Sequence, residues 1–85
     1  METDVTVPGF GGNDDDAVMR VVAYLCQAGQ RVAQGQAILE AETDKAVLEV
    51  ESPVEGVLKE YRVKCGDTVR QGDCVATVEQ RDVGT

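Results

Sequence analysis

The 85-residue sequence contains no histidine, no tryptophan and one phenylalanine. Imidazole is the side chain most often used for proton transfer near neutral pH and for metal ligation, so histidine-based catalysis and histidine-ligated metal sites are excluded. A chain of this length is also close to the lower limit at which one hydrophobic core supports a fold unaided. These absences favour a carrier or binding module without catalytic residues of its own.

Basic residues are scarce as well. Eight lysines and arginines stand against sixteen aspartates and glutamates, which gives a formal net charge of −8. Proteins that bind nucleic acids need a basic surface that displaces counterions, so this class of function is excluded. The sequence has no apolar run long enough to span a membrane, and its acidic start, Met1-Glu2-Thr3-Asp4, is unlike a signal or transit peptide. We therefore expect no nucleic-acid or membrane partner.

The three cysteines, Cys26, Cys65 and Cys74, form no CxxC pair. An odd number without that spacing argues against a disulfide framework or a zinc site, so we expect reduced thiols that pack as small apolar side chains near the core. The acidic run from Asn13 to Asp16 lacks the alternating aspartates and distal glutamate of a calcium loop. The sequence therefore predicts no metal site.

Short valine-rich runs separated by glycines indicate an all-β fold, either a barrel or a sandwich. The signal for helices is poor. We expect strands at Asp4–Val7, Val18–Cys26, Ala37–Thr43, Ala46–Val50, Gly56–Val63 and Cys74–Val78, with further short pairings around Val32 and Val69.

An internal repeat supports this fold class. Sliding the sequence by 37 residues gives five identities in the seventeen positions from Tyr24 to Glu40, where ordinary composition gives about one by chance. The identities are Tyr24/Tyr61, Gly29/Gly66, Val32/Val69, Gln34/Gln71 and Gly35/Gly72. Two copies are too few for a solenoid, so the repeat predicts two similar halves with approximate two-fold symmetry. The alternative is that a turn-rich β protein uses the same G-x-x-V-x-x-G pattern twice by coincidence.

The segment from Leu39 to Val50 has the pattern of a β-hairpin folded about the peptide that joins Asp44 to Lys45. Residues whose numbers sum to 89 then face each other across two antiparallel strands. The pairs are Leu39/Val50, Glu40/Glu49, Ala41/Leu48 and Glu42/Val47. Side chains alternate between the two faces of a strand, so this register turns the residues of the two fully apolar pairs toward the core and the three glutamates toward water.

Lys45 lies at the tip of this hairpin. Two-residue hairpin loops favour Asn-Gly or Asp-Gly because the second position often requires a positive φ, so lysine is an unfavourable choice on conformational grounds. Such local rules are often broken where function requires a particular residue. A solvated turn lysine is the alternative. Against it, Lys45 is the only cation between Arg31 and Lys59, and its acidic surroundings suggest an amine exposed for ligation to an acyl group: Glu40, Glu42, Asp44, Glu49 and Glu51.

These residues resemble the lipoyl-attachment hairpin of 2-oxo acid dehydrogenase complexes. The match comprises Glu42-Thr43-Asp44-Lys45-Ala46, Leu48-Glu49-Val50-Glu51-Ser52-Pro53 and Gly56-Val57. It also includes Gly29, sixteen residues before Lys45, together with Val5 to Pro8, Gly11-Gly12 and Gly66 to Val69. The resemblance runs from Val5 to Glu79. We therefore take residues 1–79 as one lipoyl domain and residues 80–85 as a polar tail or the start of a linker.

The resemblance implies a flattened β-barrel, or sandwich, of two four-stranded antiparallel sheets with a pseudo-two-fold axis. It places Lys45 at one end and both termini at the other. It further implies that Lys45 carries a covalent lipoate. Asp44, Ala46 and Glu42 would then be read by a lipoyl ligase or transferase.

The implied role is that of a swinging arm, in which the cofactor supplies the chemistry and the domain supplies positioning. The lipoyl-lysine would shuttle acyl groups and electrons between a thiamine-dependent 2-oxo acid decarboxylase, an acyltransferase domain and a dihydrolipoyl dehydrogenase. The domain itself would not be an enzyme but part of, or associated with, a dihydrolipoyl acyltransferase. We expect it to be monomeric when isolated, in a bacterial cytoplasm or a mitochondrial matrix.

The first loop departs from the family pattern. Sixteen residues separate Gly12 from Gly29, which indicates a lengthened loop. The resemblance implies that this loop lies near Lys45. We therefore expect partner recognition to involve the loop and the outward glutamates of the hairpin: Asn13, Asp14, Asp15, Asp16, Glu40 and Glu49.

Two single residues also depart from the pattern. Gln30 replaces the acidic residue that usually follows the turn glycine and that its repeat partner, Asp67, keeps. Glu51 stands where the family often has proline. We expect neither to change the fold.

Three other assignments compete with a lipoyl domain. A biotinyl carrier domain shares the fold, but its lysine usually lies between methionines, whereas Met1 and Met19 are far from Lys45 in the sequence. A glycine-cleavage carrier protein also bears a lipoyl-lysine but is longer and has additional helices. The last alternative is an unmodified barrel that serves as an interaction module.

Overall fold

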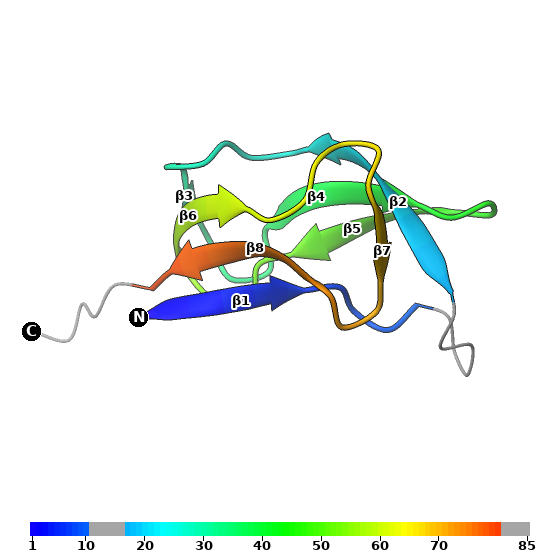
Figure 1. Ribbon diagram of the computed structural model, residues 1–85. Coiled ribbons are helices and arrows are strands. Elements are labelled where there is room, and N and C mark those ends of the chain that lie inside the picture. The colour runs from blue at the N-terminus through cyan, green and yellow to red at the C-terminus, as the bar shows by residue number, and fades with distance from the viewer. Residues whose placement is uncertain (11–16, 81–85) are drawn as a thin grey trace, which may run out of the picture.

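The computed structural model describes residues 1–10 and 17–80, which fold into eight β-strands (Figure 1). The strands are β1 Glu2–Thr6, β2 Val18–Tyr24, β3 Arg31–Val32, β4 Ala37–Glu42, β5 Val47–Glu51, β6 Gly56–Tyr61, β7 Thr68–Arg70 and β8 Cys74–Glu79. All six expected strands and both short pairings are present, and each end lies within two residues of its expected place. In these ranges no helix forms, so none is long and apolar enough to cross a membrane.

The strands form two four-stranded antiparallel sheets. Their orders are β1-β8-β6-β3 and β5-β4-β2-β7. In each sheet the two inner strands are six or seven residues long and the outer strands are five residues or shorter. Short outer strands limit edge-to-edge pairing with other chains. The expected sandwich of two four-stranded sheets is therefore confirmed.

The core between the sheets is made of small and medium-sized aliphatic side chains. The buried residues are Val5, Val7, Met19, Val21, Cys26, Val32, Ile38, Leu39, Ala41, Val50, Leu58, Val69, Val75, Ala76 and Val78. No aromatic ring belongs to this buried set, and the single phenylalanine, Phe10, packs only against its margin. Such a core suits the close face-to-face packing of two sheets.

All three cysteines are free thiols, but they differ in burial. Cys26 belongs to the core, Cys74 is half-buried and Cys65 is exposed. The expectation that each packs near the core is therefore wrong for Cys65. This residue lies in the turn between β6 and β7, where the chain has left both sheets.

The 37-residue sequence repeat is also a structural repeat. Gly29 N–H donates to the carbonyl of Leu58 at 2.7 Å, and Gly66 N–H donates to the carbonyl of Val21 at 2.8 Å. The two donors lie 37 residues apart in the sequence, and so do the two acceptors. That shift carries β2 onto β6 and β4 onto β8, so it exchanges the two sheets. Coincidental reuse of a turn pattern does not produce this agreement, and the predicted pseudo-two-fold symmetry is confirmed.

Two tyrosines related by the repeat hold the halves together. The rings of Tyr24 and Tyr61 stack with centroids 3.9 Å apart and planes inclined by 12°. The Tyr24 hydroxyl donates to the Val63 carbonyl at 2.6 Å, and the Tyr61 hydroxyl donates to the Cys26 carbonyl at 2.7 Å. Burial raises the pKa of Tyr61, so this phenol keeps the proton that it donates. Each ring therefore anchors the opposite half of the domain.

The departures at Gln30 and Glu51 leave the fold unchanged, as expected. Gln30 Oε1 accepts from Gln27 N–H at 3.1 Å, in the same way that Asp67 Oδ2 accepts from Lys64 N–H at 2.9 Å. An amide oxygen thus replaces a carboxylate oxygen in the same turn. Glu51 is exposed at the end of β5.

Candidate functional site

The β4–β5 hairpin has the register that the sequence predicted. The pairs are Leu39/Val50, Glu40/Glu49, Ala41/Leu48 and Glu42/Val47. Leu39, Ala41 and Val50 are fully buried and fix the hairpin to the core. Because a slip of one residue would turn these side chains outward, the position of the hairpin tip is well specified.

The glutamates of the hairpin are less exposed than predicted. Glu49 is exposed, but Glu40 and Glu42 are half-buried. β4 is an inner strand, with β2 on one side and β5 on the other, so side chains on its outer face are partly covered by their neighbours. The sequence pattern gave the outward direction of these side chains but not the position of their strand within the sheet.

The turn at the tip is closed by the hydroxyl of Thr43. Thr43 Oγ1 accepts from Lys45 N–H at 3.1 Å and from Ala46 N–H at 3.0 Å, and it donates to the Ala46 carbonyl at 3.3 Å. Thr43 N–H donates to the same carbonyl at 2.8 Å. One side chain therefore satisfies the polar backbone groups that a two-residue loop would otherwise leave open.

This turn corrects the expectation that lysine is strained at the tip. No non-glycine residue in the described ranges has a positive φ, so Lys45 adopts an ordinary backbone conformation. Thr43 is the signal in the sequence for this turn, because a threonine hydroxyl can accept hydrogen bonds from the backbone N–H groups two and three residues later. The side chain of Thr43 therefore fixes the backbone position of Lys45.

Lys45 projects from one end of the domain. It is exposed, and its ammonium group forms no ion pair with any residue in the ranges 1–10 and 17–80. Figure 1 shows the tip of the β4–β5 hairpin at the end opposite the N-terminus. Gln80 N–H donates to the Met1 carbonyl at 2.7 Å, so both ends of the described chain lie together. The expected separation of Lys45 from the termini is confirmed.

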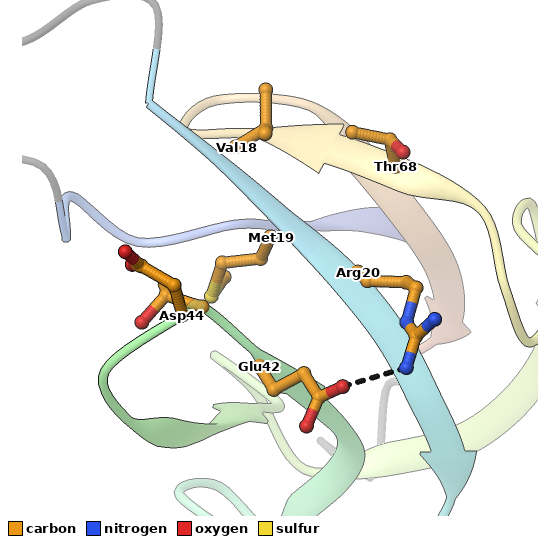
Figure 2. A pocket seen from close by; sticks show the side chains of 7 residues that line it. Val18, Met19, Arg20, Glu42, Asp44 and Thr68 are labelled. Carbon is orange, nitrogen blue, oxygen red and sulfur yellow. Dashed lines mark hydrogen bonds and ion pairs between the residues drawn. The ribbon is translucent and has the colours of Figure 1, made fainter.

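An open pocket of about 280 Å³ lies beside this tip. Its walls come from the start of β2, from Thr68 of β7 and from Glu42, Thr43 and Asp44 of the hairpin. Figure 2 shows Met19 directed toward Asp44 and Arg20 reaching across to Glu42. Arg20 Nη2 lies 2.8 Å from Glu42 Oε1. Sequence reasoning missed this cation because 22 residues separate it from its partner.

The two neighbours of Lys45 that were predicted to be read by a ligase, Asp44 and Ala46, are both exposed. Asn13, Asp14, Asp15 and Asp16, predicted to contact partners, lie outside the described residues. Within the described ranges, no three cysteine, aspartate or glutamate side chains are grouped closely enough to hold a metal ion.

Glu40 and Glu49 form a cross-strand pair of like charge, which is an unfavourable arrangement. The only other glutamate pair of this kind among the described strands, Glu2/Glu79, has Lys59 beside it. There the hydrogen bond from Lys59 holds the pKa of Glu2 below its usual value. No cation pairs with Glu40 or Glu49 in the part of the chain that the structure describes.

Replacing Thr43 with valine is expected to release the two amides at the tip. Loss of a hydrogen bond of this kind costs about 1 kcal/mol, which corresponds to roughly five-fold faster exchange of the Lys45 and Ala46 amide protons. NMR measurement of amide exchange checks this. Thr43→Ser keeps the hydroxyl and should exchange at the original rate. Equal rates in Thr43→Val and the parent protein would contradict the role of this hydroxyl.

Comparison with known families and proteins gives a consistent result. A family model described as "Biotin-requiring enzyme" matches residues 3–78. The chain is 35% identical over 75 residues to the dihydrolipoyllysine-residue acetyltransferase component of the pyruvate dehydrogenase complex of Pseudomonas aeruginosa, covering 88% of this chain and 13% of that protein. It is 38% identical over 79 residues to the dihydrolipoyllysine-residue succinyltransferase component of the 2-oxoglutarate dehydrogenase complex of Bartonella vinsonii. This match covers 93% of this chain and 19% of that protein. The chain thus spans less than a fifth of the length of these relatives.

Two solved structures share the fold. The solution structure of the lipoyl domain of the 2-oxoglutarate dehydrogenase complex from Azotobacter vinelandii superposes with a TM-score of 0.66 at 26% identity, over 89% of this chain and 96% of that one. The urea carboxylase of Kluyveromyces lactis superposes with a TM-score of 0.77 at 20% identity, over 93% of this chain and 6% of that one. The second likeness concerns the fold alone.

Proposed function

The chain belongs to the biotin- and lipoyl-attachment family, as a lipoyl domain of the dihydrolipoyllysine acyltransferase type, and we propose that Lys45 carries its lipoyl group as a swinging arm. The observation that supports this proposal most directly is the β4–β5 hairpin. It presents one exposed amine at the end of the domain, on a turn closed by Thr43. The domain is a carrier, and the enzymes it serves supply the catalytic residues.

The residues at the tip fit an amide-linked group. Lys45 offers a primary amine with no competing ion pair among the described residues, while Asp44 and Ala46 beside it are open to a modifying enzyme. A bound lipoyl group supplies a dithiolane that can be reductively acylated and reoxidised. The hairpin holds the attachment point at a fixed place, and the core residues beneath it keep that place rigid. Tethering raises the concentration of the arm at each active site that it can reach.

The relatives support a proposal for the partners. We propose a lipoyl ligase or transferase for attachment through Asp44, Ala46 and Glu42, then a thiamine-dependent decarboxylase, an acyltransferase domain and a dihydrolipoyl dehydrogenase. Both acetyltransferase and succinyltransferase components are among the relatives, so the 2-oxo acid is left open. Glu40 and Glu49 are proposed contacts for a basic partner surface, because their mutual repulsion falls when a cation approaches.

The test is attachment itself. The domain is incubated with lipoyl ligase, ATP and lipoate, and in parallel with biotin ligase, ATP and biotin, and its intact mass is measured. We expect the mass of one lipoyl group, located on Lys45 by peptide mapping, and no biotin. Lys45→Arg should remain unmodified, while the matched variant Lys64→Arg, in an exposed turn, should be modified normally. A biotin adduct, or lipoylation of Lys45→Arg, would rule the proposal out.

A further inference from the structure

The pocket beside the tip lies next to Lys45, which is not among the residues that line it. One wall is formed by Val18 and Met19 at the start of β2 and by Thr68 of β7, and the facing wall is formed by the last residues of β4 and the turn. Asp44, which belongs to the facing wall, immediately precedes Lys45 in the sequence. The pocket therefore begins one residue from the attachment point.

The composition of the pocket suits a compact apolar group. Val18 keeps 43% of its surface exposed, on the outward face of a strand whose inward residues Met19 and Val21 are buried. Beneath it Met19 is buried and points toward the hairpin (Figure 2). Arg20 and Glu42 offset each other's charge at 2.8 Å, which leaves Asp44 as the one charged residue of the lining without an ion pair among the described residues. Exposed apolar surface with paired charges at its border is typical of a ligand-binding pocket.

A group attached to Lys45 reaches this pocket without dissociating from the protein. A short flexible tether gives an effective concentration in the millimolar range. A site with a dissociation constant of about 1 mM, which is weak for a free ligand, is then about half occupied. A shallow and open pocket is sufficient for such a site.

We propose that this pocket is a resting site for the dithiolane end of the lipoyl arm. The proposal rests on lipoylation of Lys45 and adds a place where the arm lies between visits to partner enzymes. The exposed surface of Val18 contacts the ring, with the buried Met19 behind it, and the Arg20–Glu42 pair borders the site. Weak binding is necessary for function, since the arm must leave for an active site of a partner at every step.

The first test is NMR on the lipoylated domain, with modification verified by intact mass. Relative to the unmodified domain, we expect the resonances of Val18, Met19 and Thr68 to shift along with those of the turn. In lipoylated Val18→Asp the shifts at Met19 and Thr68 should be lost. Val22→Asp is the matched control, because Val22 is 38% exposed on the same strand but does not line the pocket. In lipoylated Val22→Asp the shifts at Met19 and Thr68 should be the same as in the lipoylated parent protein. Val18→Ser provides a milder change with the same expected loss.

The second test is the rate at which dithiothreitol reduces the dithiolane of the arm, with the thiols it releases then trapped by N-ethylmaleimide and read by mass on the Lys45 peptide so that the three cysteines do not contribute. If the pocket holds the arm half of the time, Val18→Asp should raise the rate about two-fold and Val22→Asp should not. Shifts confined to residues 43–46, or equal rates in the three proteins, would overturn the resting site while leaving lipoylation established. A domain that does not become lipoylated would overturn the proposed function instead.

Discussion

Exchanging the two residues at the tip, Asp44→Lys with Lys45→Asp, is expected to abolish lipoylation. The exchange preserves composition, net charge and the presence of an exposed lysine in the turn. It moves the amine to a position whose side chain lines the pocket beside β2, whereas Lys45 does not line that pocket (Figure 2). Thr43 Oγ1 holds the backbone of residue 45 at 3.1 Å, so the two positions are not interchangeable by a small shift of the turn.

The measurement is intact mass after incubation with lipoyl ligase for the time in which the parent protein is fully modified. We expect no adduct on the exchanged variant, against complete modification of the parent. The β4–β5 register should persist, which the NMR spectra of Leu39, Ala41 and Val50 report. Modification of the exchanged variant at the parent rate would show that the ligase needs only an accessible lysine in the turn. The fixed position of Lys45 would then have no part in recognition.

Replacing Gly56 with alanine is expected to be the most damaging single substitution at any glycine in the described ranges. A Cβ at this position would lie 2.4 Å from the Glu79 carbonyl oxygen and 2.9 Å from Val78 Cγ1. Gly56 is the first residue of β6, and β6 pairs with β8 in the middle of its sheet. Relief of the contact requires two backbones to separate, so we expect a loss of about 3 kcal/mol. A domain of this length has a total stability of about 4–13 kcal/mol.

Urea unfolding measures this loss, and Gly29→Ala is the control. Gly29 has a φ of 91°, but a Cβ there meets nothing within 4 Å. Its substitution carries only the conformational penalty of a left-handed backbone, about 1 kcal/mol. Gly56 has no positive φ and is needed for space alone. A Gly56→Ala variant that is as stable as Gly29→Ala would show that β8 can move away from β6 at little cost.

Much of the fold could be predicted because its determinants are local or repeated. Alternating apolar residues fix the register of β4 against β5, since Leu39, Ala41 and Val50 can be buried together in only one way. The repeat predicted the symmetry because Gly29 and Gly66 must both adopt a positive φ, which keeps glycine at both positions. Patterns of this kind are visible along the chain before any tertiary contact is known.

The features that the sequence did not predict depend on contacts between distant strands. Arg20 meets Glu42 only because β2 lies next to β4 in the sheet, and the same neighbour half-buries Glu40. The space requirement at Gly56 arises from β8, which lies some twenty residues further along the chain. The role of Thr43 is local, but it depends on side-chain hydrogen bonds to the Lys45 and Ala46 amides, which the φ preferences of turn residues do not describe.

The hydrogen bond between Met1 and Gln80 has a counterpart in the other half of the domain. Gln80 N–H donates to the Met1 carbonyl at 2.7 Å, and Thr43 N–H donates to the Ala46 carbonyl at 2.8 Å. The shift of 37 residues that relates the two halves carries Thr43 onto Gln80, so Met1 and Gln80 occupy the place in one half that the lysine-bearing turn occupies in the other. The strand connections would therefore be nearly symmetric if Gln80 were joined to Met1, since that junction is equivalent to the turn between Thr43 and Ala46. The Lys45 amine lies at one end of the domain and the Met1–Gln80 pair lies at the other, so a segment joined at Met1 or Gln80 would start at the end opposite Lys45.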